Sequence, residues 1–324
     1  MFESRALSLR FGCILACLLL CSITATSQTS VDSDHDGIPD AQEQALLEQF
    51  RPTFLISASD CAVRPARFAP DQVIPHPVAA DGTIYGQVFP VRDSQNIEIH
   101  YYTLWDRDCG RMQHPLDVEH VSVIVKNDEG QDATALYWYA GAHENTACEI
   151  SSGGRAAAID AQHQGPKVWS SSGKHAMYLR KSMCNHGCGA DSCEDAQELA
   201  QIGRVVNLGE PGTPANGALW TSSSQWTLSS KMDTDFPAEL IARLDATSGE
   251  SVITLRGSSS IRGTIQGSGT VLNAGGVGAQ HTSAALDTAN GHTSRSLGKA
   301  SRATGRWLKG ARDAVLGKTS TQKN

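Results

Sequence analysis

The sequence lacks the motifs of several large enzyme classes. It has no Ser-His-Asp ordering typical of a hydrolase, no glycine-rich phosphate-binding loop and no cysteine motif typical of a nucleophile. No internal repeat is present, so a repeat architecture is not expected. Aromatic residues make up only 6% of the chain, whereas Gly, Ser and Thr are plentiful. This composition favours a β-rich fold, and we expect a binding protein rather than an enzyme.

The N-terminal apolar run is too short for a membrane-spanning helix. It extends from Phe11 to Ala25, whereas a spanning helix needs ~20 apolar residues. Arg5 and Arg10 precede the run, and Ala25-Thr26-Ser27 places small residues at a cleavage position. We therefore predict that residues 1–27 are a cleaved signal peptide and that the mature protein is secreted or periplasmic.

Six cysteines remain after the predicted signal, and they are Cys61, Cys109, Cys148, Cys184, Cys188 and Cys193. An even number in an exported chain indicates disulfides, here up to three, and six cysteines allow 15 pairings. The cluster Cys184-x3-Cys188-x4-Cys193 contains His186, which leaves zinc binding as an alternative. Common zinc sites, however, use a paired C-x2-C spacing that is absent here.

The segment after the signal fits a twelve-residue calcium loop of the EF-hand type. Carboxylates occupy positions 1, 3, 5, 9 and 12, and a glycine at position 6 permits the sharp turn. The predicted ligands are Asp32, Asp34, Asp36, the carbonyl of Ile38, Asp40 and Glu43. Carboxylates at this density repel one another without a cation, so we predict Ca²⁺ here; a solvated acidic linker is the alternative. The loop also resembles the calcium repeats of thrombospondin type 3 and dockerin modules.

A helix and several strands follow the loop. The helix is predicted from Pro39 to Arg51, with Leu46, Leu47 and Phe50 on its apolar face and Asp40, Glu43 and Glu48 on its exposed side. Strands are predicted at Thr83–Phe89, Ile97–Trp105, Val118–Lys126, Ala133–Ala140, Lys167–Ser170 and His175–Arg180, and a second helix at Ser192–Ile202. The pattern indicates a mainly β fold, an antiparallel β-sandwich with a few peripheral helices.

The chain divides by composition into five parts. We predict the signal at 1–27, the calcium loop and helix at 28–52, the sandwich at 53–245, a Gly/Ser-rich hairpin and linker at 246–294, and a basic tail at 295–324. Within the fourth part, 251–276 is the predicted hairpin and 277–294 the flexible linker.

A second cluster of possible metal ligands lies around the third predicted strand. Glu119 shares a strand face with buried valines, and Asp117 precedes it on the same side. Buried carboxylates are costly unless they are paired or bound to a metal. His114 can reach the same point, so a site for Ca²⁺, Mg²⁺ or Mn²⁺ is predicted. The alternative is a structural carboxylate pair satisfied by Arg107 or Arg111.

This stretch resembles the signature region of the necrosis- and ethylene-inducing-peptide-like cytolysins. The resemblance is carried by His114-x-x-Asp117-x-Glu119-His120-Val121 and by the aromatic strand from Tyr101 to Asp108. It places the family's metal ligands on Asp108, His114, Asp117 and Glu119. Leu116 and Val118 depart from the family's pattern. The resemblance implies a β-sandwich with a surface metal that helps to bind sphingolipid head groups, without catalysis.

Two further segments look like motifs of a related plant family linked by name to vacuolar protein sorting. They run from Tyr137 to Glu144 and from Pro166 to Tyr178, so that the whole resemblance covers about residues 45–240. Within them, Glu144 and His175 are possible ligand-site residues. A structural role remains open for each: a hydrogen-bonded histidine at 175 and a surface pair of Glu144 with His143.

Charge is distributed unevenly. The segment from His292 to the end carries +7 and the predicted signal +1, so the body between them must carry −15 because the whole chain carries −7. The basic residues between Arg295 and Lys309 recur at helical spacing opposite an apolar face with Trp307. This tail favours either an anionic membrane surface or docking on the acidic body, and nucleic acid is the least favoured partner.

Together these features predict a secreted calcium-binding β-sandwich with a second divalent-metal site. It would bind a surface ligand such as a membrane lipid or glycolipid, as a cytolysin does. One alternative is a metal-dependent hydrolase of phosphoester or glycan substrates, with His175 or Glu144 as acid or base. Another is a purely structural or adhesive exported module. The sequence does not indicate an oligomeric state.

Overall fold

The computed structural model describes residues 31–256, except 93, 111–112, 128–131, 145, 147, 199–202, 210–213, 233–234 and 248–251. The predicted signal peptide and basic tail lie outside the described residues, as does the predicted linker at 277–294. Within the described residues, no helix is long and apolar enough to cross a membrane.

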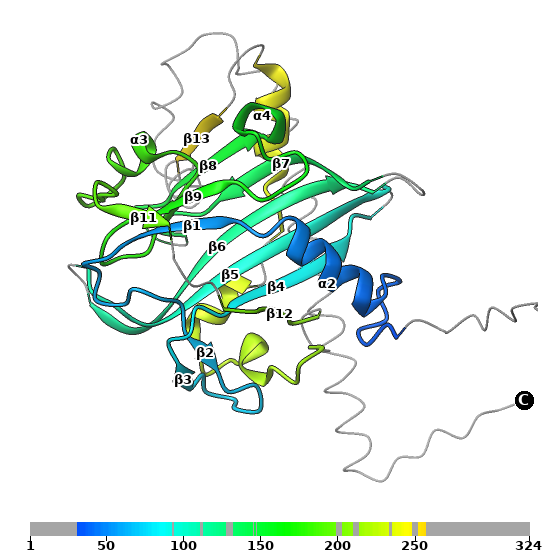
Figure 1. The fold of residues 1–324 in the computed structure, drawn as a ribbon, viewed down its shortest axis with the longest axis horizontal. Coiled ribbons are helices and arrows are strands. Elements are labelled where there is room, and N and C mark those ends of the chain that lie inside the picture. Colours follow the sequence, from blue (N-terminus) through cyan, green and yellow to red (C-terminus); the bar gives the residue numbers. More distant parts are fainter. Residues whose placement is uncertain are drawn as a thin grey trace, which may run out of the picture. The chain divides into compact units, whose positions relative to one another are not determined.

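A seven-stranded sheet forms the larger layer of the fold (Figure 1). In spatial order its strands are β12 (Val205–Asn207), β4 (Ile84–Pro90), β5 (Asn96–Asp108), β6 (His114–Lys126), β7 (Thr134–Ala140), β8 (Ile150–Arg155) and β13 (Val252–Arg256). Only the β12–β4 pairing is parallel. The long β5–β6 pair extends from Asn96 opposite Lys126 to Asp108 opposite His114, and it carries the predicted second site.

A four-stranded sheet forms the second layer. Its order is β10 (Met177–Tyr178), β9 (Lys167–Ser170), β1 (Thr53–Ser57) and β11 (Ala196–Glu198). Side chains of both sheets share one buried core, in which Phe54 and Val168 of the smaller sheet join Ile99, Val121 and Val123 of the larger one. The predicted β-sandwich is therefore confirmed. Its strands are mainly antiparallel, but β1 and β9 pair in parallel.

Helices and short strands surround the two sheets (Figure 1). They are α2 (Asp40–Gln49), α3 (Lys181–Cys184), α4 (Ala238–Ala246), η1 (Ala156–Ile159), η2 (Leu219–Ser222), η3 (Thr227–Met232), β2 (Arg67–Phe68) and β3 (Pro77–Ala79). The last two form a separate two-stranded sheet. A second buried cluster lies beneath η2 and η3 and includes Tyr102, Trp220 and Trp226.

Helix α2 packs closely on the edge of the larger sheet. Leu47 is fully buried, and a Cβ atom at Gly86 of β4 would lie 2.2 Å from its Cδ2 atom. Glycine is therefore needed for this close approach. The predicted apolar face of the helix is confirmed. The prediction that Glu43 is exposed is wrong: its side chain is only 1% exposed, because β12 covers that side of the helix and Asn207 contacts the Glu43 carboxylate.

One sequence-based prediction of secondary structure is wrong. Residues 196–198 of the helix predicted at Ser192–Ile202 form β11, which pairs with β1. The disulfide at Cys193 ties the start of this segment to Cys184, and the edge of β1 offers hydrogen bonds that outweigh helix propensity. Of the hairpin predicted at 251–276, only residues 252–256 lie within the described residues, and they form β13, which pairs with β8. The larger sheet thus extends beyond the predicted boundary at residue 245.

All six cysteines of the described residues form disulfides. The pairs are Cys61–Cys109, Cys148–Cys188 and Cys184–Cys193. Every cysteine of the predicted zinc alternative is thus bonded to sulfur and cannot bind a metal as a thiolate. Three disulfides are typical of a protein from an oxidising compartment.

We expect Leu47→Ala to lower the free energy of unfolding by about 2–5 kcal/mol, because it removes a fully buried side chain and leaves a cavity beside Gly86. Urea unfolding would measure the loss. The control is Val63→Ala, which changes a side chain that is 43% exposed and should shift stability by less than about 0.5 kcal/mol. Equal effects of the two substitutions would show that α2 is not packed on the sandwich.

Candidate functional site

The N-terminal loop, the predicted calcium loop, forms a tight turn around Asp32. The carboxylate of Asp32 accepts hydrogen bonds from the backbone N–H groups of His35 at 2.8 Å and Gly37 at 3.1 Å. Gly37 adopts a φ of 97°, a conformation that favours glycine. Ile38 is buried in the shared core and anchors the end of the turn. The loop is thus folded back on its first carboxylate.

Three carboxylates converge within this turn. Ligand oxygens of Asp32, Asp34 and Asp36 all lie within 4.8 Å of one another. Asp40 lies apart from this group, because its two oxygens accept hydrogen bonds from the backbone N–H and the hydroxyl of Ser33. Position 9 of such loops often acts through a water molecule, so the Asp40 arrangement fits the pattern.

Glu43 closes the turn from helix α2. Its Oε2 atom accepts a hydrogen bond of 2.7 Å from the side-chain amide of Asn207, while its buried Oε1 atom has no hydrogen-bond partner among the described residues. Burial raises the pKa of this carboxyl to about 7, and the charges of Asp34 and Asp36 add to the increase. A carboxylate in this position needs a positive charge to remain ionised at neutral pH.

The predicted second site has a different arrangement. Asp117 and Glu119 are both buried, and the ammonium group of Lys231 in η3 lies between them. Its Nζ atom is 3.2 Å from Glu119 Oε1 and 3.7 Å from Asp117 Oδ1, and it donates a 2.7 Å hydrogen bond to the carbonyl of Val118. Burial opposes the charge of Lys231, but the two carboxylates outweigh it and raise the pKa of the ammonium group.

The other two predicted ligands of this site do not join the pair. Asp108 accepts a 2.6 Å hydrogen bond from the backbone of Gly110, and its Oδ2 atom is 4.0 Å from His114 Nε2. The four residues Asp108, His114, Asp117 and Glu119 are not among the described groups whose ligand atoms lie within 4.8 Å of one another. They do not fit a divalent cation as they stand, since Lys231 holds the position between the two buried carboxylates. The predicted second metal stays a prediction that requires Lys231 to move.

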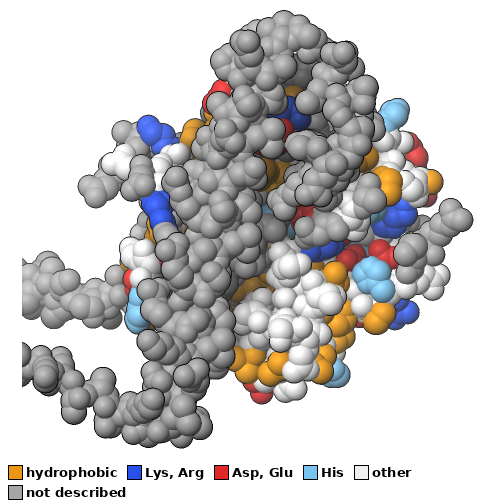
Figure 2. Space-filling model, turned by 180° about the vertical axis from the view of Figure 1, so that it is seen from behind, with side chains coloured by type: hydrophobic (Ala, Val, Ile, Leu, Met, Phe, Trp, Pro, Cys, Tyr) orange, Lys and Arg blue, Asp and Glu red, His pale blue; other side chains and the backbone are white. Residues whose placement is uncertain are grey.

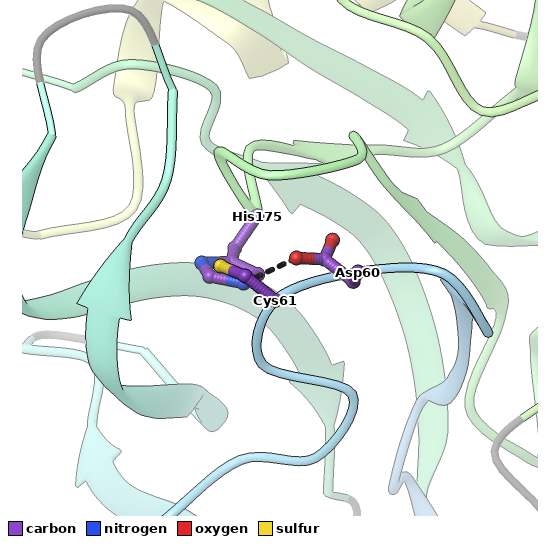
Figure 3. Close-up of side chains that lie close together, drawn as sticks. All are labelled: Asp60, Cys61 and His175. Carbon is purple, nitrogen blue, oxygen red and sulfur yellow. Dashed lines mark ion pairs between the residues drawn. The ribbon is translucent and has the colours of Figure 1, made fainter.

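His175 is fully buried and lies between the carboxylates of Asp117 and Asp60, and Figure 3 shows it beside Asp60. Its Nδ1 atom is 3.3 Å from Asp117 Oδ2, its Nε2 atom is 3.5 Å from Asp60 Oδ1, and its ring stacks on Trp105 at 3.9 Å. Burial disfavours the imidazolium form, but the two carboxylates outweigh it and raise the pKa of His175 to about 9. Cys61 lies beside this pair, but its sulfur is bonded to Cys109 and cannot bind a metal as a thiolate.

Glu144 belongs to a second buried chain of polar side chains. Its Oε1 atom accepts a 2.8 Å hydrogen bond from the hydroxyl of Tyr139 and lies 3.3 Å from His120 Nδ1. The other ring nitrogen of His120 is 2.7 Å from His100, which in turn contacts Glu98 at 2.7 Å. Glu144 is thus not a surface partner of His143, which contacts Asp191 instead. Because Glu144 and His175 are both buried, neither offers an exposed acid or base to a substrate.

Sequence reasoning missed two residues of this centre, Asp60 and Lys231. Both lie more than 50 positions from Asp117, in segments without regular strand patterns, and only the tertiary fold brings them together. A physical argument could have indicated one of them: a buried carboxylate pair such as Asp117 and Glu119 requires a cation, which a lysine from elsewhere in the chain can supply. The predicted alternative named Arg107 or Arg111 as the cation beside Asp117 and Glu119. Arg107 pairs with Asp106 instead, and Arg111 lies outside the described residues.

No protein-family profile and no curated protein matches the chain. Several solved structures are similar to it. The structural neighbours are proteins of the NLP toxin fold. One is the necrosis- and ethylene-inducing protein 2 from the causal agent of witches' broom disease of cocoa, at 19% identity and a TM-score of 0.36 over 68% of this chain and 99% of that one. Another is the non-toxic protein HaNLP3, at 13% identity and a TM-score of 0.35 over 58% and 83%. A third is NLPPya solved with glucosamine, at 15% identity and a TM-score of 0.33 over 55% and 76%. Such values do not carry ligands or residue roles from these proteins to this chain.

We expect Lys231→Met to lower the free energy of unfolding by about 3–5 kcal/mol, because it leaves Glu119 buried without a cation and removes one of the two basic partners of Asp117. The control is Lys181→Met, which breaks a largely exposed pair with Glu194 and should cost less than about 1 kcal/mol. Denaturant unfolding measures both. A small loss for Lys231→Met would contradict a charge role for this lysine, and rescue of the variant by Ca²⁺, Mg²⁺ or Mn²⁺ would support the predicted second metal.

Proposed function

We propose that the chain is an exported calcium-binding β-sandwich protein whose N-terminal loop binds Ca²⁺ and thereby fixes helix α2 on the larger sheet. The observation that carries this proposal is the buried Oε1 atom of Glu43, which has no hydrogen-bond partner among the described residues and faces the charges of Asp34 and Asp36. An unpaired buried carboxylate beside like charges is costly unless a cation binds there.

The loop differs in this respect from the rest of the protein. The other buried acids outside the loop each lie beside a basic side chain: Asp60 and Asp117 beside His175, Glu119 beside Lys231, Glu144 beside His120, and Asp191 beside Lys174 and His143. Among the described residues, Glu43 forms no ion pair with a basic side chain. This contrast supports a cation from solution at the loop, in place of one supplied by the chain.

The predicted ligands fit a hard divalent cation. Asp32, Asp34, Asp36 and Glu43 would supply carboxylate oxygens, Ile38 would supply its carbonyl, and Asp40 would act through water. Bound calcium would supply positive charge to neutralise these groups. Because Glu43 belongs to α2 and contacts Asn207 of β12, binding would hold the helix against the sheet edge.

We further propose that the protein acts at a surface and binds membrane lipid or glycolipid, as the sequence resemblance implies. Exposed apolar side chains gather near the β2–β3 connection: Val73, Ile74, Val78 and Leu219 are each 47–59% exposed. The backbone N–H of Leu219 binds the carbonyl of Pro70, which joins η2 to this connection. The lower part of the described surface in Figure 2 is mostly uncharged, with apolar side chains around its edges. Apolar side chains of this kind can enter the interfacial region of a bilayer.

Calcium should raise the free energy of unfolding of the mature protein by about 2.7 kcal/mol at a free concentration 100 times its Kd. Glu43→Gln should abolish most of this gain, whereas Glu48→Gln, on the exposed side of the same helix, should retain it. Calorimetry with calcium and with chelator measures the effect. Equal stabilisation of both variants would contradict the proposed site.

The stability of the calcium-free protein, and its affinity for calcium, should both depend on pH, and calorimetry at several pH values measures both. The pKa of Glu43 rises from the ordinary 4.5 to about 7 on folding, so the calcium-free protein should lose stability as pH increases from 4.5 to 7. Calcium competes with the proton, so its affinity should fall as pH decreases below 7.

Ile74→Asp should weaken binding to vesicles at least about tenfold, because burial of an isoleucine side chain contributes roughly 1.5–3 kcal/mol. The control is Ala157→Asp, which places the same charge at an exposed position in η1. Co-sedimentation with vesicles of phosphatidylcholine, with and without glycosphingolipid, measures the partition. If the unchanged protein binds neither type of vesicle while it is folded and calcium-loaded, lipid recognition is excluded and the calcium proposal stands.

A further inference from the structure

A cavity of about 240 Å³ lies beside the calcium loop, between α2, β12 and the segment that leads into η2. Its lining includes Gln44, Arg67, Arg204, Asn216 and Trp220. Pockets for drug-sized ligands are usually larger, roughly 300–1,000 Å³, so this one suits a molecule of about one sugar ring. It is separate from the buried centre around Lys231, because none of its lining residues belongs to that centre.

Two guanidinium groups give the cavity a positive character. Arg67 is ion-paired with Asp81 at 2.8 Å, whereas Arg204 is exposed and forms no ion pair among the described residues. Guanidinium groups bind phosphate and carboxylate by paired hydrogen bonds. Arg204 is therefore available for an anionic group of a ligand.

Uncharged groups in the same lining suit hydroxyl groups. The side-chain amides of Gln44 and Asn216 donate to the carbonyls of Val205 and Asn207, so their oxygen atoms remain as acceptors. A ligand with several hydroxyl groups could donate to these amide oxygens.

One wall of the cavity is connected to the calcium loop. Asn207 lines the cavity, and its side-chain amide donates to Glu43 Oε2 at 2.7 Å while its Oδ1 atom accepts from the backbone of Gly209 at 3.0 Å. A Cβ atom at Gly209 would lie 3.2 Å from Asp34 Oδ2, so the loop also packs directly on this segment. A change in the position of Glu43 or Asp34 would therefore move the cavity wall.

We propose that this cavity binds a small anionic polyol, a hydroxylated ring that carries a phosphate or carboxylate, and that calcium at the neighbouring loop strengthens this binding. The coupling rests on the proposed calcium site, whereas the ligand site itself does not. Linkage then requires that the ligand tighten calcium binding by the same factor. The ligand can be free in solution or can be the head group of a lipid, since both offer the same chemistry.

Titration calorimetry of the mature protein with glucose 6-phosphate tests the site, with glucose and inorganic phosphate as separate arms. We expect saturable binding of glucose 6-phosphate, at least tenfold weaker in Arg204→Gln and unchanged in Arg243→Gln, an exposed arginine of α4 outside the cavity. Calcium should tighten binding at least fivefold relative to chelator, and Glu43→Gln should remove this difference. Vesicles of phosphatidylcholine with and without phosphatidylinositol phosphate show whether a lipid head group also binds.

Three negative results would each overturn a different part of the proposal. Absence of saturable binding while calcium still stabilises the protein overturns the ligand site and leaves the calcium proposal intact. Equal affinity for inorganic phosphate and glucose 6-phosphate overturns the assignment of a polyol. Equal affinity with calcium and with chelator, in protein that binds calcium, overturns the coupling.

Discussion

The cost of removing a carboxylate from water shapes this structure more than any other interaction. Seven acids are buried among the residues that the structure describes: Asp34, Glu43, Asp60, Asp117, Glu119, Glu144 and Asp191. A buried carboxylate without a compensating charge destabilises the fold by several kcal/mol. The folded chain therefore brings a lysine or histidine to most of these groups, and this requirement decides how η3 and the segment around His175 pack against the larger sheet.

The protein meets this requirement in two ways. In the interior, Lys231 and His175 supply cations that belong to the chain, so the polar centre is complete when folding is complete. At the N-terminal loop the acids are closer in sequence and Glu43 has only an amide partner, so neutralisation depends on solvent conditions. The first arrangement stabilises the sandwich permanently. Under the proposed calcium binding, the second would make the position of α2, and of the cavity wall next to it, responsive to calcium.

Aromatic side chains complete the interior around these charges. The rings of Trp105 and His175 stack, as do those of His100, His120 and Tyr102 on the neighbouring strands. A histidine in such a stack is held in one orientation and shielded from water, which suits a structural role and not proton transfer to a substrate. The buried centre is thus held by ring stacking as well as by charge.

Local sequence patterns determined the long strands of the larger sheet, the apolar face of α2 and the turn at Gly37, because alternation, helical spacing and turn chemistry act between residues that are close in the chain. They also identified Asp117 and Glu119 as buried acids that need a cation. Only the tertiary structure decided that Lys231 is this cation, that Glu43 is covered by β12, and that residues 196–198 form a strand. These outcomes depend on contacts between segments distant in sequence, for which the local pattern carries no information.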